Sequence, residues 1–174
     1  DRAQLADTPD ELMKRLGEAP AGQATARPSE FLPMGEKRGL LEFTLKMLHA
    51  AAPAAVDCVP LPMGAPFGTL DVNVEGCTLC LACVSACPTG ALSGGEDRPA
   101  LRFDESACVQ CGLCAGTCPE KVITLVPQLH FTAWSTPPRT TKEEEPFCCI
   151  RCAKPFGTKS TIDRIIAKLE SRHW

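Results

Sequence analysis

The spacing of apolar residues predicts two helices in the N-terminal part of the chain. Thr8 is the expected N-cap of the first helix, because its hydroxyl can accept a backbone N–H bond, and Pro9 suits the first helical position. Residues 36–52 carry apolar side chains three and four positions apart, which predicts the second helix. Glu42 stands four residues before Lys46 in this segment, so the two side chains can form an ion pair along it.

A third helix is predicted at the C-terminal end of the chain, over residues 160–169. Ser160 is its expected N-cap, with Asp163 at the position that completes a capping box. Four apolar residues then fall on one face of the helix: Ile162, Ile165, Ile166 and Leu169.

The middle of the chain repeats itself with an offset of 31 residues. Residues 70–73 align with 101–104, and residues 91–92 align with 122–123. Each half is predicted to contain a short strand, a cysteine-rich loop, a helical turn and a second short strand. A proline follows the last cysteine of each half and ends the helical turn, because proline lacks a backbone N–H group and restricts the residue before it.

The cysteine spacing inside this repeat indicates an iron–sulfur protein. The chain has 12 cysteines in 174 residues, a composition that disulfide scaffolds share. Each half, however, has the spacing C-x2-C-x2-C-x3-C-P, which places three cysteines on one tight loop. Disulfides between such near neighbours would be strained, and a structural zinc site uses two paired knuckles. A cube of iron and sulfide accepts this geometry, since each thiolate can reach a different iron.

The fourth cysteine of this motif binds the cluster of the other half. We therefore expect two [4Fe-4S] clusters whose ligands cross between the halves. Metal binding and folding should then be one event, because the crossing ties the halves together. The predicted ligands of the first cluster are Cys77, Cys80, Cys83 and Cys118, and those of the second are Cys108, Cys111, Cys114 and Cys87.

Residues 70–126, with both motifs and both prolines intact, resemble a bacterial-type two-[4Fe-4S] ferredoxin domain. The resemblance covers about a third of the chain and implies an electron carrier with two low-potential, one-electron sites. It implies an α+β fold in which two βαβ halves pack about a pseudo-twofold axis, a ferredoxin-like (βαβ)2 domain. The whole chain also resembles the C-terminal portion of longer bacterial iron–sulfur proteins that accompany redox enzymes such as formate dehydrogenases.

Three domains are expected from these patterns. Residues 1–69 form a helical and proline-rich extension, which includes an irregular linker over residues 17–35; residues 70–126 form the ferredoxin domain; and residues 127–174 hold a linker, a C-x2-C knuckle and the terminal helix. The linker of the third segment, residues 127–174, is expected to be extended and polar, and its acidic run is expected to lie in a solvated loop. Because the chain begins with aspartate, we expect it to be a piece of a longer protein.

Charge and hydropathy narrow the classes of partner. The net charge is −3 with 22% charged residues, which makes nucleic acid an unlikely partner. The sequence contains no run of 18 apolar residues, the length that a membrane-spanning helix needs. Residues 70–126 have seven acidic and three basic residues, whereas residues 127–174 have eight basic and five acidic ones. The charge of the acidic domain could attract it to a basic surface on a partner. Alternatively, the charged residues could form an ordinary solvated surface, or the basic segment could fold back on the acidic domain. Because neither cysteine loop is extended, we expect similar reduction potentials at the two clusters.

Four cysteines lie outside the repeat. Cys149 and Cys152 resemble the knuckle of zinc ribbons, except that Ala153 stands where a glycine usually follows. A zinc ion here would need further ligands, from Cys148, Cys58, His173 or a partner chain. The alternative is a set of free thiols, which persist in a reducing compartment; the expected location is cytoplasmic.

Electron transfer is the function these features favour, as a module or subunit of a larger oxidoreductase complex with a redox protein partner. A freely diffusing ferredoxin is disfavoured by the long flanks, and a structural or redox-sensing iron–sulfur module of an assembly or regulatory protein is the alternative. We do not expect an enzyme. The chain has no nucleotide-binding glycine loop, and four protein ligands per cluster leave no iron open to substrate.

Overall fold

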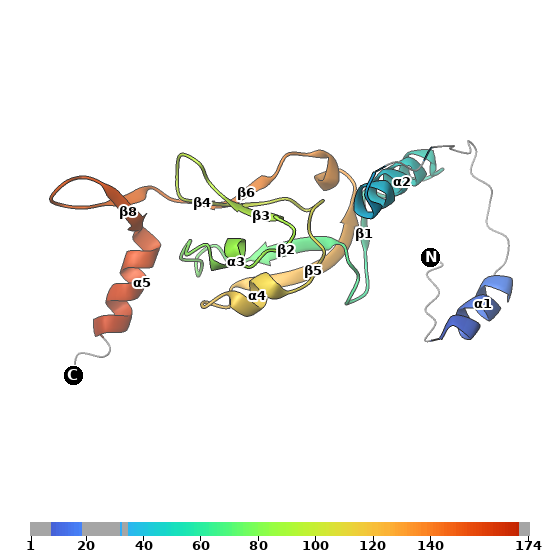
Figure 1. Cartoon of the computed structure of the whole chain (residues 1–174), viewed down its shortest axis with the longest axis horizontal. Coiled ribbons are helices and arrows are strands. Elements are labelled where there is room, and N and C mark those ends of the chain that lie inside the picture. The colour runs from blue at the N-terminus through green and yellow to red at the C-terminus, as the bar shows by residue number, and fades with distance from the viewer. Residues whose placement is uncertain (1–7, 19–31, 33–34, 171–174) are drawn as a thin grey trace. The chain divides into compact units, whose positions relative to one another are not determined.

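The computed structural model describes residues 8–18, 32 and 35–170, and it combines helices with antiparallel strands (Figure 1). The fold class is therefore α+β, as expected. The chain divides into two units, residues 1–55 and 56–174. The expected domain limits lie elsewhere, at residues 69/70 and 126/127, and stay a prediction. Within the described ranges, no helix is long and apolar enough to cross a membrane.

The N-terminal unit contains the two predicted helices, α1 (Pro9–Glu18) and α2 (Lys37–Ala51). The Thr8 hydroxyl accepts a hydrogen bond from the Glu11 N–H at 3.2 Å, which confirms Thr8 as the N-cap of α1. In α2 the predicted ion pair forms, with 2.8 Å between Lys46 Nζ and Glu42 Oε1. The predicted linker over residues 17–35 lies mostly outside the described residues.

The repeated segment of the second unit forms two strand–helix–strand halves. Antiparallel pairing joins the first strand of the first half to the last strand of the second, and the two inner strands to each other. The two short helices contact each other. The halves are β2 (Gly68–Val72), α3 (Ala82–Ser85) and β3 (Leu92–Gly94), followed by β4 (Ala100–Phe103), α4 (Leu113–Thr117) and β5 (Ile123–His130).

Flanking strands widen both sheets to three strands. β1 (Cys58–Pro60) pairs with β5, and β6 (Arg139–Glu143) pairs with β4. Between β5 and β6 a 3-10 turn, η1 (Ala133–Ser135), buries Trp134, whose ring centroid lies 5.3 Å from that of Phe67. The segment after residue 126 is thus extended and polar along β6, but it is also packed on the domain, because β6 pairs with β4 and Trp134 packs on Phe67.

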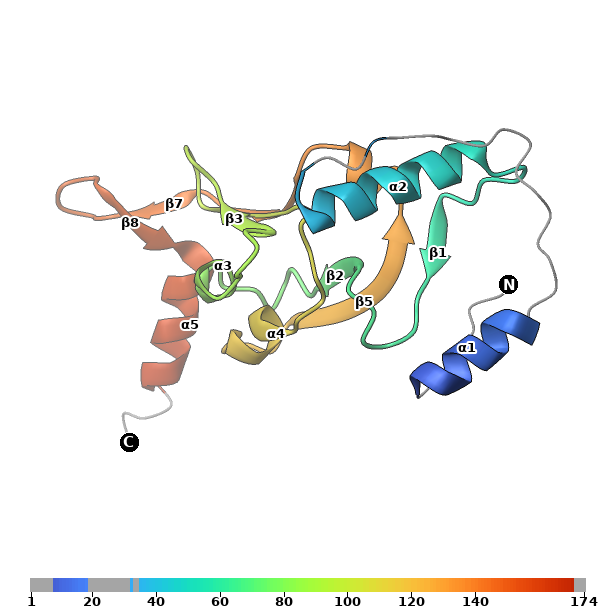
Figure 2. The same ribbon diagram turned by 45° about the vertical axis from the view of Figure 1, so that its right-hand side comes forward.

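A hairpin and the third predicted helix complete the chain (Figure 2). The hairpin consists of β7 (Pro146–Cys148) and β8 (Pro155–Thr158), and helix α5 (Lys159–Glu170) follows it directly. The predicted N-cap is wrong by two residues: the Thr158 hydroxyl accepts the N–H bond of Thr161 at 3.3 Å, and Ser160 lies inside the helix. Most of the predicted apolar stripe of α5 is exposed to solvent: Ile165, Ile166 and Leu169.

The hydrophobic core lies between the sheets and the cysteine loops. Leu101 and Phe103, on alternate positions of β4, are the largest side chains that are fully buried. They pack in one cluster with buried residues of the other strands and with the buried cysteines: Leu70, Val72, Leu79, Cys83, Ala91, Leu92, Cys108, Cys114 and Ile123. The core and the cysteine loops are thus a single packed body.

Leu101→Ala should destabilise this body markedly. Removing a fully buried leucine side chain costs about 2–5 kcal/mol, which corresponds to a thermal midpoint roughly 5–15 °C lower in a chain of this size. The control is Leu113→Ala, since the Leu113 side chain on α4 is 52% exposed. Thermal melting followed by circular dichroism checks both variants. Equal midpoints for Leu101→Ala and the unsubstituted protein would contradict this description of the core.

Candidate metal centre

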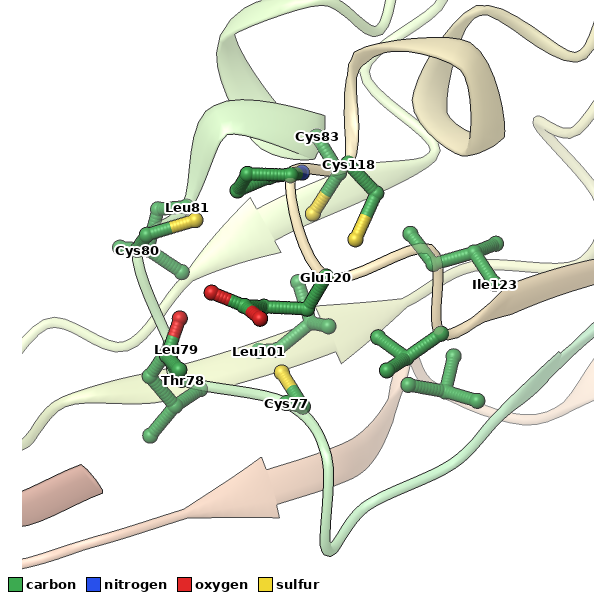
Figure 3. A pocket seen from close by; sticks show the side chains of 13 residues that line it. Cys77, Thr78, Leu79, Cys80, Leu81, Cys83, Leu101, Cys118, Glu120 and Ile123 are labelled. Carbon is green, nitrogen blue, oxygen red and sulfur yellow. The ribbon is translucent and has the colours of Figure 1, made fainter. Parts of the chain in front are cut away.

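Three cysteines of the first motif and one of the second surround a small apolar cavity. Figure 3 shows the sulfur atoms of Cys77, Cys80, Cys83 and Cys118 placed around this first cavity, from α3, the loop before it and the end of α4. Apolar side chains fill the wall between the sulfur atoms, among them Leu79, Leu81, Leu101 and Ile123.

A second small cavity has the same construction. Its wall contains Cys108, Cys111 and Cys114 of the second motif together with Cys87 of the first. Phe103, Leu92 and Leu125 line the space between them. The structure therefore brings together both sets of four cysteines that the spacing suggests, and each set draws on both halves of the repeat.

The two cysteine loops also repeat in their backbone conformation. Left-handed φ values occur in the first half at Leu79 (+52°), Leu81 (+56°) and Gly90 (+69°). The positions 31 residues further on are left-handed as well: Gln110, Gly112 and Lys121. Left-handed residues placed among right-handed ones turn successive backbone N–H groups to the concave side of a loop, which suits an anionic guest. A strained conformation at four non-glycine positions indicates that the loops are shaped around an object.

Burial disfavours the ionised form of the innermost thiols. It raises the pKa of Cys83 to about 11, with a smaller contribution from the neighbouring thiols of Cys77 and Cys114. Burial likewise raises the pKa of Cys108 and of Cys114. Thiolates at these positions therefore need cations inside the cavities, and metal ions supply them.

Hydrogen-bond donors reach two sulfur atoms of the second cavity. Burial opposes ionisation of Cys87, but backbone N–H groups of Leu92, Thr89 and Ala91 and the Thr89 hydroxyl together lower its pKa. The Gln110 side-chain amide lies 3.5 Å from Cys108 Sγ and 2.9 Å from the Thr69 carbonyl oxygen, so it can donate to both. Such N–H···S bonds stabilise a metal-bound thiolate.

The arrangement fits a polynuclear cluster better than a single metal ion. Among the described residues, no three His, Cys, Asp or Glu side chains converge as ligands of one ion. The cysteines are instead spaced around the rims of cavities with apolar walls. Thiolates that bind different irons of a cube are separated in this way, and a dry wall excludes competing water ligands.

The C-terminal segment supports the loop of the first cavity through residues that sequence reasoning missed. Lys142 Nζ donates hydrogen bonds to the carbonyl oxygens of Cys77 and Val74. The hydroxyls of Thr158 and Thr161 both donate to the carbonyl oxygen of Thr78. Side chains from β6, β8 and α5 thus hold the backbone around Cys77 by hydrogen bonds.

Ion pairs add to this support. Glu120 follows the second motif and lines the first cavity, and its Oε2 lies 2.7 Å from Arg164 Nη2 of α5. The hydrogen bond and charge of Arg164 hold the pKa of Glu120 below its usual value. Of the three interpretations of the charge pattern, the structure shows the one in which the basic segment folds back on the acidic domain. In the sequence, the net charge of +3 over residues 127–174 indicated such an association, but it did not identify the residues in contact.

Cys149 and Cys152 lie together at the turn of the β7–β8 hairpin. Backbone N–H groups of Arg151 and Cys152 hydrogen-bond to the Cys149 sulfur and lower its pKa, and Ala153 adopts a left-handed φ of +56°. The structure brings neither Cys148 nor Cys58 to them as a third metal ligand among the described residues. His173 lies outside those residues.

Comparison with known proteins points to the same segment. The family model of a 4Fe-4S dicluster domain matches residues 76–122, which include all eight cysteines of the two cavities. Ferredoxin-3 of Chlorobaculum tepidum is 40% identical over 55 residues, and the match covers 86% of that protein and 28% of this chain.

Two longer relatives match in the same way over a small part of their length. The aliphatic sulfonate oxidoreductase polyferredoxin-like subunit of Pyrococcus furiosus is 50% identical over 40 residues, 23% of each chain. The ferredoxin-type protein NapF of Escherichia coli is 37% identical over 59 residues, which is 33% of this chain and 34% of NapF. The chain therefore matches about a quarter to a third of these two relatives.

The crossing of the ligands can be tested by counting iron in paired variants. If Cys87 and Cys111 serve the same cavity, Cys87→Ala combined with Cys111→Ala should lose one cluster and keep about four of eight irons. Cys87→Ala combined with Cys80→Ala should lose both clusters, because those residues line different cavities. Cys58→Ala, outside both cavities, is the control and should keep all the iron. Iron retained with Cys80→Ala but lost with Cys111→Ala would reverse the assignment of Cys87.

Proposed function

The chain belongs to the bacterial-type 4Fe-4S ferredoxin family, and from that premise we propose that residues 70–126 are a two-cluster (βαβ)2 domain that transfers electrons one at a time. The observation that carries this proposal is the pair of cavities, each bordered by four cysteines from both halves of the repeat. The proposed ligands are those of the crossing assignment. Cys77, Cys80, Cys83 and Cys118 hold one [4Fe-4S] cluster, and Cys108, Cys111, Cys114 and Cys87 hold the other.

The chain's own residues have three tasks in this function. The cysteines supply thiolates, and four per cluster leave no iron open to a substrate, so we propose an electron carrier rather than an enzyme. Apolar side chains such as Leu101 and Phe103 exclude water from the cavities. Backbone and side-chain N–H groups, including that of Gln110, offset thiolate charge. A bound cluster supplies a site that accepts and releases one electron without making or breaking a bond to a substrate.

The exposed cysteines suggest where electrons enter and leave. Cys80 and Cys111 occupy equivalent positions of the two loops, and both are exposed to solvent, whereas Cys83 and Cys114 are buried. A partner that docks over Cys80 or Cys111 reaches a metal ligand directly. We propose that each of these two residues marks one docking face, so that the two clusters form a path across the domain.

We further propose that this path serves a larger oxidoreductase. One relative is named as a subunit of an aliphatic sulfonate oxidoreductase, and the segments outside residues 76–122 make up most of the present chain. Those segments are available to bind partner subunits that hold the catalytic centre. The cytoplasmic location and the association with a formate dehydrogenase stay predictions.

Reversible reduction separates this function from a structural or sensing role. The full chain, purified without oxygen, should show a paramagnetic [4Fe-4S] signal in electron paramagnetic resonance after dithionite reduction. It should return to its oxidised absorbance spectrum on reoxidation, over repeated cycles and without loss of iron. Clusters that resist dithionite, or that release iron in the first cycle, would instead support the structural or sensing alternative.

Zinc at Cys149 and Cys152 remains a separate prediction, with the additional ligands to come from Cys148, Cys58, His173 or a partner. Metal analysis of the full chain should then find zinc beside iron. Cys149→Ser combined with Cys152→Ser should remove the zinc and leave the iron content unchanged. A chain without zinc after purification in zinc-containing buffer would show that these cysteines are free thiols.

A further inference from the structure

A buried ammonium group lies beside the loop of the first cavity. The Lys142 side chain is only 9% exposed, and its Nζ lies 2.8 Å from Glu144 Oε1. Its other contacts are the hydrogen bonds to the carbonyl oxygens of Val74 and Cys77, so its three N–H bonds all have acceptors. The Glu144 carboxylate also accepts hydrogen bonds from Ser160 of α5. The cation of this pair therefore contacts the ligand loop, while the anion contacts the C-terminal helix.

A buried carboxylate lies beside the loop of the second cavity. The Glu105 side chain is 2% exposed, and the Glu105 carbonyl accepts the N–H bond of the ligand Cys108. One carboxylate oxygen accepts a hydrogen bond from the neutral amide of Gln128 at 2.8 Å. The only charged partner in reach among the described residues is Arg139, at 3.7 Å, with a side chain that is 47% exposed. Solvent screens this cation more than it screens the buried anion.

Glu105 and the residue whose carbonyl Lys142 contacts, Val74, occupy equivalent places in the repeat. An offset of 31 residues takes Val74 to Glu105 and Cys77 to Cys108. The first loop therefore has an apolar side chain and a contacting lysine where the second loop has a buried carboxylate. The cysteine loops are alike in backbone, but the first contacts a buried cation whereas the second contains a buried carboxylate.

Glu120 is the one acidic side chain on the wall of the first cavity. It forms ion pairs with two cations of α5, Arg164 at 2.7 Å and Lys168 at 3.6 Å. The charge of Glu120 is therefore offset by its two partners on α5. Lys142, by contrast, is the buried cation that contacts the ligand loop itself, with its side chain 9% exposed. Around the second cavity the buried member of the ion pair is instead the anion, Glu105, and its partner Arg139 is 47% exposed.

We propose that Lys142 and Glu105 give the two clusters different reduction potentials, with the higher potential at the first cavity. This inference rests on the proposed two-cluster function. Reduction adds a negative charge, which a nearby buried cation stabilises and a nearby buried carboxylate destabilises. This proposed difference replaces the expectation of similar potentials, which was based on loop length alone. An electron that enters at the second cluster is then transferred downhill to the first.

A redox titration of the full chain, followed by electron paramagnetic resonance, tests the proposal with Lys142→Met and Glu105→Gln. Removing one buried charge should change the reduction equilibrium of the adjacent cluster roughly tenfold, which is 59 mV for one electron. Lys142→Met should lower the higher of the two potentials and leave the lower one in place. Glu105→Gln should raise the lower potential and leave the higher one in place.

Two steps in the unsubstituted protein do not decide the question, because repulsion between two equivalent reduced clusters also separates their macroscopic potentials. The variants do decide it. If the clusters were equivalent, Lys142→Met would make its cluster the last to be reduced and would lower the lower potential. Glu105→Gln would then raise the higher potential. Either of these results overturns the proposal, as does a failure of both variants to move any potential.

Two further variants separate charge from structural support. Lys142→Arg keeps the charge and should keep the higher potential, whereas Lys154→Met removes an equal charge from the exposed end of the hairpin and should move neither potential. If Lys142→Met loses iron, Glu105→Gln still tests the assignment at the other cavity. Iron and sulfide counts made before the titration show whether two clusters are present. Fewer than two would reject the proposed function itself, independently of any potential.

Discussion

The need to place four sulfur atoms around each of two centres is the constraint on which the rest of this structure depends. Each cysteine loop supplies three ligands at most to its own cavity, and the fourth position is filled from the other half of the repeat. The halves must therefore lie face to face, with β2 paired to β5 and β3 paired to β4. The buried cysteines form part of the hydrophobic core, so the core is continuous only when both halves are in place.

We propose that this dependence couples folding to metal binding. Burial raises the pKa of Cys83 to about 11, which means that the folded chain without metal would hold neutral thiols around hollow spaces. Metal ions convert these thiols to ligands and fill the spaces, so binding free energy becomes folding free energy. The C-terminal segment contacts the two loops differently: Lys142 and Thr158 hold the backbone of the first loop, whereas Gln128 and Arg139 contact the Glu105 side chain of the second. The asymmetry of the molecule comes from this addition to a symmetric domain.

Local patterns in the sequence predicted the parts of the fold that local interactions determine. The cap at Thr8, the ion pair within α2 and the two cysteine loops all depend on residues within a few positions of one another. The pairing of β6 with β4 could not be predicted in this way, since nothing in residues 139–143 specifies a partner strand 40 positions earlier. The cap at Thr158 was misplaced because Ser160, the more conventional candidate, is bound by Glu144. The roles of Lys142 and Glu105 were hidden for the same reason: a charge in a sequence does not reveal whether it becomes buried.

The central claim is that the two four-cysteine cavities each hold a [4Fe-4S] cluster. Mössbauer spectroscopy of the full chain loaded with iron-57 tests it most directly, because the spectrum reports the nuclearity and valence of every iron. The account predicts that all the iron gives the valence-averaged doublets of [4Fe-4S] clusters, with two clusters per chain. Iron bound singly to four thiolates, or a spectrum of two-iron clusters, would contradict it.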